Sequence, residues 1–154
     1  GRTHHRTPNI ITSLELDPTE MEKRNIHLQK KYAEIEENEV RFEELHCEDA
    51  EYLIVAFGSC ARIAQKAMEI AREEGIKVGL LRPITLWPFP SKAIAARAAQ
   101  VKGILTVELN AGQMVEDVRL AVECKVPVEH FGRLGGIVPD PDEVITALKE
   151  KLIK

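Results

Sequence analysis

The sequence predicts an α/β fold in which a mostly parallel sheet lies between two layers of helices. Four short apolar runs alternate with helical patterns along residues 48–154. Such alternation is typical of a parallel sheet that helices cover on both faces, a three-layer α/β/α arrangement. Right-handed crossovers with one reversal of direction favour the strand order 2-1-3-4, counted along the four predicted strands.

The composition is that of a globular chain: of its 154 residues, 44% are hydrophobic and 30% are charged. The formal net charge of −4 gives no basic field for nucleic acid, and no apolar run reaches membrane-spanning length. Three distant cysteines without C-x-x-C spacing disfavour disulfides and metal or iron–sulfur sites, and favour a cytoplasmic location. Because the chain begins with Gly1 rather than Met, we expect it to belong to a longer polypeptide.

Residues 1–47 predict a linker and a charged connector helix. Asp17 is the expected N-cap, Pro18 the first helical residue, and Glu20 completes the capping pattern, so the helix should run to about Glu37. Its apolar residues are sparse. We therefore expect it either to lie across the following domain or a partner chain, or to be a solvated helix.

The compact domain is expected over residues 48–154. Gly75 predicts a helix end, Ser91 a helix cap, and Asp140 with Glu143 a capping box around Pro141. The predicted strands cover residues 52–57, 77–81, 103–107 and 126–130. The predicted helices cover residues 61–74, 91–101, 112–124 and 140–152.

Two glycine-containing turns at strand ends are the main candidates for a binding site. The first contains Gly58, Ser59 and Arg62, and the second contains Asn110 and Gly112. In the order 2-1-3-4 both turns meet at the carboxyl edge of the sheet, where open α/β sheets bind partners. Amide groups at helix N-termini suit an anion or a polar partner group. Neither turn completes a dinucleotide or P-loop fingerprint, so the sequence does not indicate simple nucleotide binding.

Polar side chains beside these turns have two interpretations each. Glu108 ends a strand and is a candidate acid or base, but we identify no His, Ser or Lys to complete a set with it. The favoured role for Glu108 is to accept hydrogen bonds from the glycine turns. Gln113 and Asp117 share a helix face and form either a polar docking strip or ordinary surface. Cys60 is either a thiol with a lowered pKa at a helix N-terminus or a small residue that fits a tight turn.

Two loops complete the set of candidates. Three prolines stiffen residues 83–90, which present Trp87 and Phe89 either as anchors for a partner pocket or as a cover for the sheet edge. Arg82 is expected to pair with an acidic side chain or with a ligand anion. Residues 131–139 contain three glycines and Arg133, which predict either a phosphate-binding loop or a flexible crossover.

These segments together resemble one family. Residues 55–59, 75–90, 107–120 and 132–136, which include the strings WPFP and NAGQMVEDVR, are similar to the C-terminal part of the α subunit of 2-oxoacid:ferredoxin oxidoreductases. That family includes the 2-oxoglutarate and the branched-chain (ketoisovalerate) enzymes. The similarity covers nearly all of residues 48–152.

The resemblance implies a transketolase C-terminal-like domain. The family decarboxylates a 2-oxoacid on thiamine diphosphate, passes electrons through iron–sulfur clusters to ferredoxin, and forms an acyl-CoA. Its activating glutamate lies in a pyrimidine-binding domain, and its Mg²⁺ and cluster sites lie in other domains or subunits. The resemblance therefore implies no catalytic residue, no metal ligand and no cofactor in this chain.

The implied role is assembly. The implied partners are the other domain of the α subunit, β-, γ- and δ-type subunits, ferredoxin through the complex, and a second copy of the chain in a homodimer, with neither nucleic acid nor membrane among them. Two alternatives stay open. One is a stand-alone nucleotide- or CoA-binding module that uses the glycine turns, and the other is a regulatory scaffold without a small ligand.

Overall fold

The computed structural model describes residues 7, 10–11 and 14–153. The chain divides into two compact units, Gly1–Ile35 and Glu36–Lys154. The second unit starts before the expected boundary at residue 48. The expected linker, residues 1–47, lies partly outside the described residues.

Helix α1, Pro18–Asn38, begins and ends close to its predicted limits. Asp17 Oδ1 accepts hydrogen bonds from the amides of Thr19 (2.8 Å) and Glu20 (3.2 Å), which is the expected N-cap. No residue of α1 is buried. The charged connector helix predicted from the sequence is therefore present.

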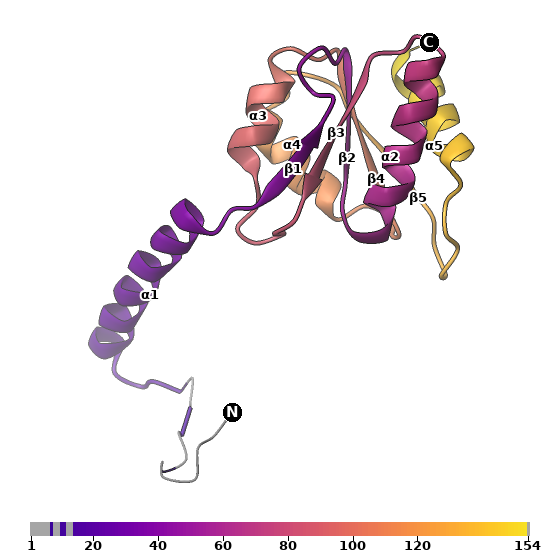
Figure 1. The fold of residues 1–154 in the computed structure, drawn as a ribbon. Coiled ribbons are helices and arrows are strands. Elements are labelled where there is room, and N and C mark those ends of the chain that lie inside the picture. The colour runs from indigo at the N-terminus through magenta and orange to yellow at the C-terminus, as the bar shows by residue number, and fades with distance from the viewer. Residues whose placement is uncertain (1–6, 8–9, 12–13, 154) are drawn as a thin grey trace. The chain divides into compact units, whose positions relative to one another are not determined.

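A five-stranded sheet forms the centre of the second unit, in the order β1-β3-β2-β4-β5 (Figure 1). The four predicted strands are all present, are mutually parallel and follow the predicted order 2-1-3-4. The strands are β1 (Phe42–Leu45), β2 (Tyr52–Ala56), β3 (Val78–Pro83), β4 (Gly103–Glu108) and β5 (Val128–Gly132).

The edge strand β1 was not predicted, and the expected four-stranded order is incomplete for that reason. It pairs antiparallel with β3, with Phe42 opposite Pro83. Its sequence, FEEL, lacks the apolar alternation that identifies a strand. Polar contacts hold both of its acidic residues instead. Glu43 pairs with Arg82 across the strands at 2.8 Å, and Glu44 accepts two hydrogen bonds from Arg97, at 2.8 and 2.7 Å.

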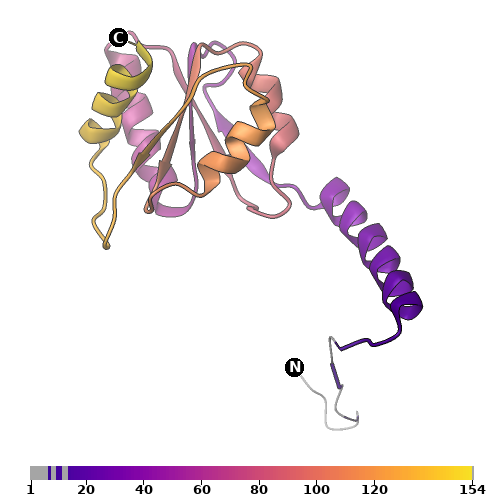
Figure 2. The ribbon, with the colours of Figure 1, turned by 180° about the vertical axis from the view of Figure 1, so that it is seen from behind.

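Helices cover both faces of the sheet (Figures 1 and 2). Helices α2 (Gly58–Glu73) and α5 (Pro141–Leu148) pack in one hydrophobic cluster, while α3 (Ser91–Ala98) and α4 (Met114–Val122) pack in the other. The predicted capping box of α5 is present. A π-helical turn, Lys149–Ile153, continues α5 over the predicted length.

Two details of the helix prediction were wrong. Ser91 is the first residue of α3 rather than its cap, because Pro90 occupies the N-cap position and makes no side-chain cap. Helix α4 begins at Met114 rather than near Gly112, because a carboxylate from β4 binds its first amides.

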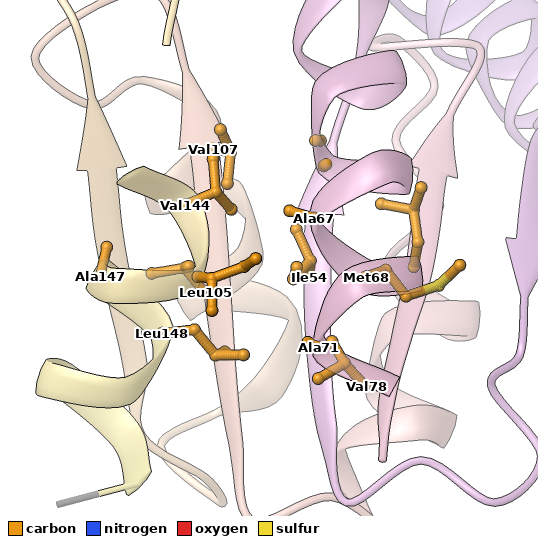
Figure 3. Packing of buried hydrophobic residues seen from close by; sticks show 14 of the residues in the cluster. Ile54, Ala67, Met68, Ala71, Val78, Leu105, Val107, Val144, Ala147 and Leu148 are labelled. Atoms are coloured by element: carbon orange, nitrogen blue, oxygen red, sulfur yellow. The ribbon is translucent and has the colours of Figure 1, made fainter. Parts of the chain in front are cut away.

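Small residues let α2 lie close to the sheet. Alanines recur on one face of α2 at positions 61, 64, 67 and 71, and all four are buried. In Figure 3, residues of α2 face Ile54 and Val78, and residues of α5 face Leu105 and Val107. The parallel strands β2, β3 and β4 are thus buried on both sides, which explains their continuous apolar runs.

The Glu44–Arg97 pair predicts a specific pH dependence. Hydrogen bonding from Arg97 lowers the pKa of Glu44 below its ordinary value of 4.5. Its stabilisation is therefore complete above the pKa of the unfolded chain and is lost as pH falls through the lower folded pKa. We expect Glu44→Gln to lower the free energy of unfolding by about 1 kcal/mol at pH 7 and to flatten its decline in acid, measured by urea unfolding.

Glu43→Gln is the matched control. The side chains of Glu43 and Arg82 are 52% and 43% exposed, against 23% and 22% for Glu44 and Arg97. Solvent screens the first pair more strongly, so its loss is expected to cost under about 0.5 kcal/mol. Equal losses in the two variants would contradict the prediction.

Candidate functional site

The two glycine turns lie beside each other at the carboxyl edge of the sheet, as expected. We call residues 57–62 the first corner and residues 108–114 the second corner. Strands β2 and β4 are direct neighbours, with Ala56 opposite Val107, so the two corners follow adjacent strand ends. The charge of Glu108 in the second corner also acts on Cys60 in the first.

Glu108 is the centre of the second corner. It ends β4, and it is only 1% exposed. Its Oε2 accepts hydrogen bonds from the amides of Met114 (2.8 Å) and Gln113 (3.2 Å), and its Oε1 accepts one from Val115 (3.1 Å). The carboxylate thus binds the N-terminus of α4, where amides and helix dipole favour a negative charge. The Glu108 carboxylate therefore binds the helix amides that the sequence analysis considered as a site for a ligand anion.

Asn110 and Gly112 shape the chain around this carboxylate. Asn110 Nδ2 donates to Glu108 Oε2 (3.2 Å), and Asn110 Oδ1 accepts from the amide of Gly112 (2.7 Å). Gly112 has φ +111°, a conformation that side chains disfavour. Asn110 and Gly112 therefore fold the turn back onto Glu108.

His130 is the residue that sequence analysis missed. Its Nδ1 lies 3.4 Å from Glu108 Oε1 and 3.2 Å from Thr106 Oγ1, and its Nε2 lies 3.3 Å from the Asn110 carbonyl oxygen. The statement that no His accompanies Glu108 was therefore wrong. The register of β4 and β5 is the signal that would have found it, because His130 pairs with Thr106, two residues before Glu108 on the same sheet face.

Gly132 allows β5 to approach the second corner. A Cβ atom at this position would lie 2.2 Å from the Asn110 carbonyl oxygen and 2.6 Å from His130 Nε2. The amide of the next residue, Arg133, donates to the Glu108 carbonyl oxygen at 3.3 Å. The Glu108 carboxylate of the second corner is thus enclosed by backbone amides, Asn110 and His130.

The first corner differs, because helix α2 begins there without a side-chain cap. Phe57 occupies the N-cap position, and Gly58, Ser59 and Arg62 are exposed. Of the two interpretations of Cys60, the thiol with a lowered pKa is wrong, since burial, and then Glu108, raise the pKa of Cys60. Cys60 is buried and fits the alternative interpretation of a small residue in a tight turn.

Two of the three candidate arginines, Arg82 and Arg133, are held in ion pairs. Arg82 pairs with Glu43 of β1, which is the first of the two expected outcomes, pairing with an acidic side chain. Arg133 pairs with Glu143 of α5 at 3.0 Å, and Glu143 also accepts from the amide of Asp140 at 3.0 Å within the capping box. The glycine-containing loop after β5 is therefore attached to the start of α5.

The two candidate aromatic residues and the candidate docking strip lie at the surface to different degrees. Trp87 is 56% exposed, whereas Phe89 is half-buried against the hydrophobic cluster of α3 and α4. Gln113 and Asp117 are both exposed. Trp87 is thus the more accessible of the two aromatic candidates.

In the part of the chain that the structure describes, no group of three His, Cys, Asp or Glu residues is placed to hold a metal ion. Within the same residues, no helix has both the length and the apolar character needed to cross a membrane. The site combines one sealed polar corner with one open helix start.

Replacing Glu108 tests the sealed corner. Glu108→Gln keeps the shape but places an amide donor where a carboxylate oxygen accepts from the helix. We expect the free energy of unfolding to fall by about 3 kcal/mol in urea titrations. Glu116→Gln, an exposed change in the first turn of α4, should cost less than about 0.5 kcal/mol. Similar losses in both variants would mean that Glu108 is not the centre of the corner.

Gly132→Ala tests the close approach of β5. Its Cβ would collide with backbone, and we expect a loss of about 3 kcal/mol in thermal or urea unfolding. Gly103→Ala, in β4 of the same sheet, is the control, because the nearest atoms to its Cβ would belong to the Leu152 side chain, the first at 2.8 Å. That flexible side chain can move, so a loss near 1 kcal/mol or less is expected. The reverse order of the two effects would contradict this account.

Comparisons with known proteins agree with the family resemblance that was noted from the sequence. Residues 50–144 match the family "Pyruvate:ferredoxin oxidoreductase core domain II". The chain is 46% identical to ketoisovalerate oxidoreductase subunit VorB of Methanothermobacter marburgensis over 142 residues, which are 92% of this chain and 40% of the relative. The chain thus spans less than half the length of that relative.

Solved structures agree. A 2-oxoglutarate:ferredoxin oxidoreductase from Magnetococcus marinus, with 2-oxoglutarate, coenzyme A and succinyl-CoA bound, superposes with a TM-score of 0.76 at 25% identity, over 88% of this chain and 24% of that one. A split-gene transketolase has the same fold, with a TM-score of 0.63 at 20% identity, over 73% of this chain and 41% of that one. The resemblance noted from the sequence is therefore confirmed, and the chain belongs to the pyruvate:ferredoxin oxidoreductase core domain II family.

Proposed function

We propose that this chain is core domain II of the α subunit of a 2-oxoacid:ferredoxin oxidoreductase. The complete enzyme would oxidatively decarboxylate a 2-oxoacid, form an acyl-CoA and reduce ferredoxin. The observation that carries this proposal is the 46% identity to VorB over 92% of the chain. Because the chain corresponds to only 40% of VorB, the activity is proposed for the assembled enzyme.

Ketoisovalerate is the substrate that we favour. The identity to the ketoisovalerate enzyme subunit is 46%, against 25% to the 2-oxoglutarate enzyme of known structure. We propose that another domain selects the substrate side chain. The polar groups of the second corner bind one another instead.

The proposed role of this domain is assembly rather than chemistry. A diphosphate does not fit the second corner, because the Glu108 carboxylate binds the amides that would hold a phosphate oxygen. Mg²⁺ does not fit either, since the oxygens of Glu108 are already bound by N–H donors. We therefore assign thiamine diphosphate, Mg²⁺, the iron–sulfur clusters and CoA to other domains and subunits.

The proposed partners follow from the same assignment. They are the other domain of the α subunit, β-, γ- and δ-type subunits, and ferredoxin through the complex, with a homodimer of α subunits as a further possibility. A cytoplasmic location is part of the proposal, supported by the free state of Cys47, Cys60 and Cys124.

Reconstitution tests the function. Alone, the chain is expected to give no thiamine diphosphate binding in calorimetry and no 2-oxoacid-dependent reduction of a viologen dye. Combined with the remaining domains and subunits of the enzyme, it should be required for dye reduction, faster with 2-oxoisovalerate than with 2-oxoglutarate. Dye reduction by the chain alone, or full activity of the enzyme without it, would overturn the proposal.

A further inference from the structure

The exposed apolar side chains of the second unit gather at one end of the sheet. Among its described residues, nine large hydrophobic side chains are exposed, and eight of these lie at the carboxyl ends of the parallel strands. The ninth, Leu120, lies on α4 and is 78% exposed. We call the eight residues the apolar rim; they are Phe42, Ile84, Leu86, Trp87, Leu109, Leu134, Ile137 and Val138.

The topology explains why residues so distant in sequence share this end. The loops after β3, β4 and β5 all leave the sheet at its carboxyl edge, because these strands are parallel. Phe42 joins them from the antiparallel strand β1, since it pairs with Pro83 at the end of β3. The apolar rim therefore extends along the edge from β1 to β5.

The opposite edge of the sheet has a different character. Its turns present charged side chains, among them Lys77, Lys102 and Lys125, and the last two form ion pairs with Glu51 and Glu123. If both edges of the sheet faced water, we would expect them to expose similar shares of apolar side chains. Clustered exposed apolar groups mark interaction sites. This inequality favours an interaction surface at the apolar rim.

We propose that the apolar rim is covered by the part of a VorB-like subunit that precedes this domain, beyond the 154 residues. The inference rests on the proposed function and specifies the face that serves assembly. The relative VorB is much longer than this chain, which corresponds to 40% of it. A covering domain on the same polypeptide is therefore available in the proposed enzyme.

The path of the chain selects this occupant. Because β1 is antiparallel, the polypeptide enters the sheet at the carboxyl edge. The Arg41 carbonyl oxygen accepts from the amides of Ile84 (2.9 Å) and Thr85 (3.1 Å), and the Arg41 amide donates to Thr85 Oγ1 (3.0 Å). The chain that leads into β1 at Arg41 thus lies next to the loop that carries Leu86 and Trp87. A tether raises the effective concentration of a covering domain, an advantage that a second copy of the chain lacks.

The charged groups near the rim fit an apolar contact. Arg82 is paired with Glu43, and Arg133 is paired with Glu143, so these side chains already have partners within the domain. Because these charged side chains are paired, the exposed apolar side chains between them are the groups that gain from being covered. An apolar covering surface then adds burial without stranding a charge.

Hydrogen–deuterium exchange tests the proposal directly. The 154-residue chain alone is compared with the same residues within the assembled enzyme, reconstituted from its subunits. Amides of residues 84–90, 109–113 and 133–138 should exchange at least about tenfold more slowly in the assembly. Residues 99–102 and 123–127, at the opposite edge, are the matched control and should change less than about twofold. No slowing at the rim, or equal slowing at both edges, would overturn the proposal.

Substitutions provide the second arm. Leu86→Glu and Ile137→Glu replace exposed side chains and should leave the circular dichroism and unfolding of the isolated chain unchanged. Each should weaken its binding to the remaining part of the α subunit, supplied separately, by at least about tenfold. Leu120→Glu, an exposed change away from the rim, should bind within about twofold of the unchanged chain. Equal binding by all variants would contradict the rim as the interface.

Two further results separate the possible failures. If sedimentation shows dimers of the isolated chain that Leu86→Glu abolishes, a second copy covers the rim and the proposed occupant is wrong. If the assembly forms with a protected rim but oxidises no 2-oxoacid, the proposed function fails and the docking inference stands.

Discussion

The burial of one carboxylate organises the carboxyl end of this fold. Glu108 lies at the end of the central strand β4 with 1% of its surface exposed. A buried charge is tolerated only when hydrogen bonds replace its lost hydration. Three amides at the start of α4 and the side chain of Asn110 meet this requirement, and the ring of His130 lies 3.4 Å from the carboxylate. The position of α4, the turn before it and the close approach of β5 all depend on this carboxylate.

This arrangement changes what the crevice of an open α/β sheet can do. Such sheets commonly bind ligands where strand order reverses, using helix N-termini as anion sites. Here the reversal lies between β2 and β4, but the protein's own anion binds the helix start of the second corner. The surrounding loops expose apolar groups such as Leu86 and Leu109. The same edge that is a ligand crevice in other α/β proteins therefore has the chemistry of a protein interface in this one.

The sequence was informative wherever a local pattern determined the structure. Asp140 and Glu143 predicted a helix start because a capping box needs only residues three apart. Apolar runs such as residues 103–107 predicted buried strands and, through the crossover rule, their order. Strand β1 was not predicted, because its Glu43 and Glu44 are held by arginines that lie 39 and 53 positions away in the sequence. The contact of His130 with Glu108 was not predicted for a related reason, since it depends on the register between two strands.

The unpredicted strand has the larger functional consequence. Without β1, the chain before Tyr52 would enter the parallel sheet at the amino ends of its strands, which is the charged edge. Adding one antiparallel strand beside β3 brings that entry to the carboxyl edge instead. A strand of four residues thus sets the edge at which the chain enters the sheet. If the rim docks as proposed, the ion pairs of Glu43 and Glu44 serve assembly as well as stability, because they hold the strand that brings the chain to the carboxyl edge.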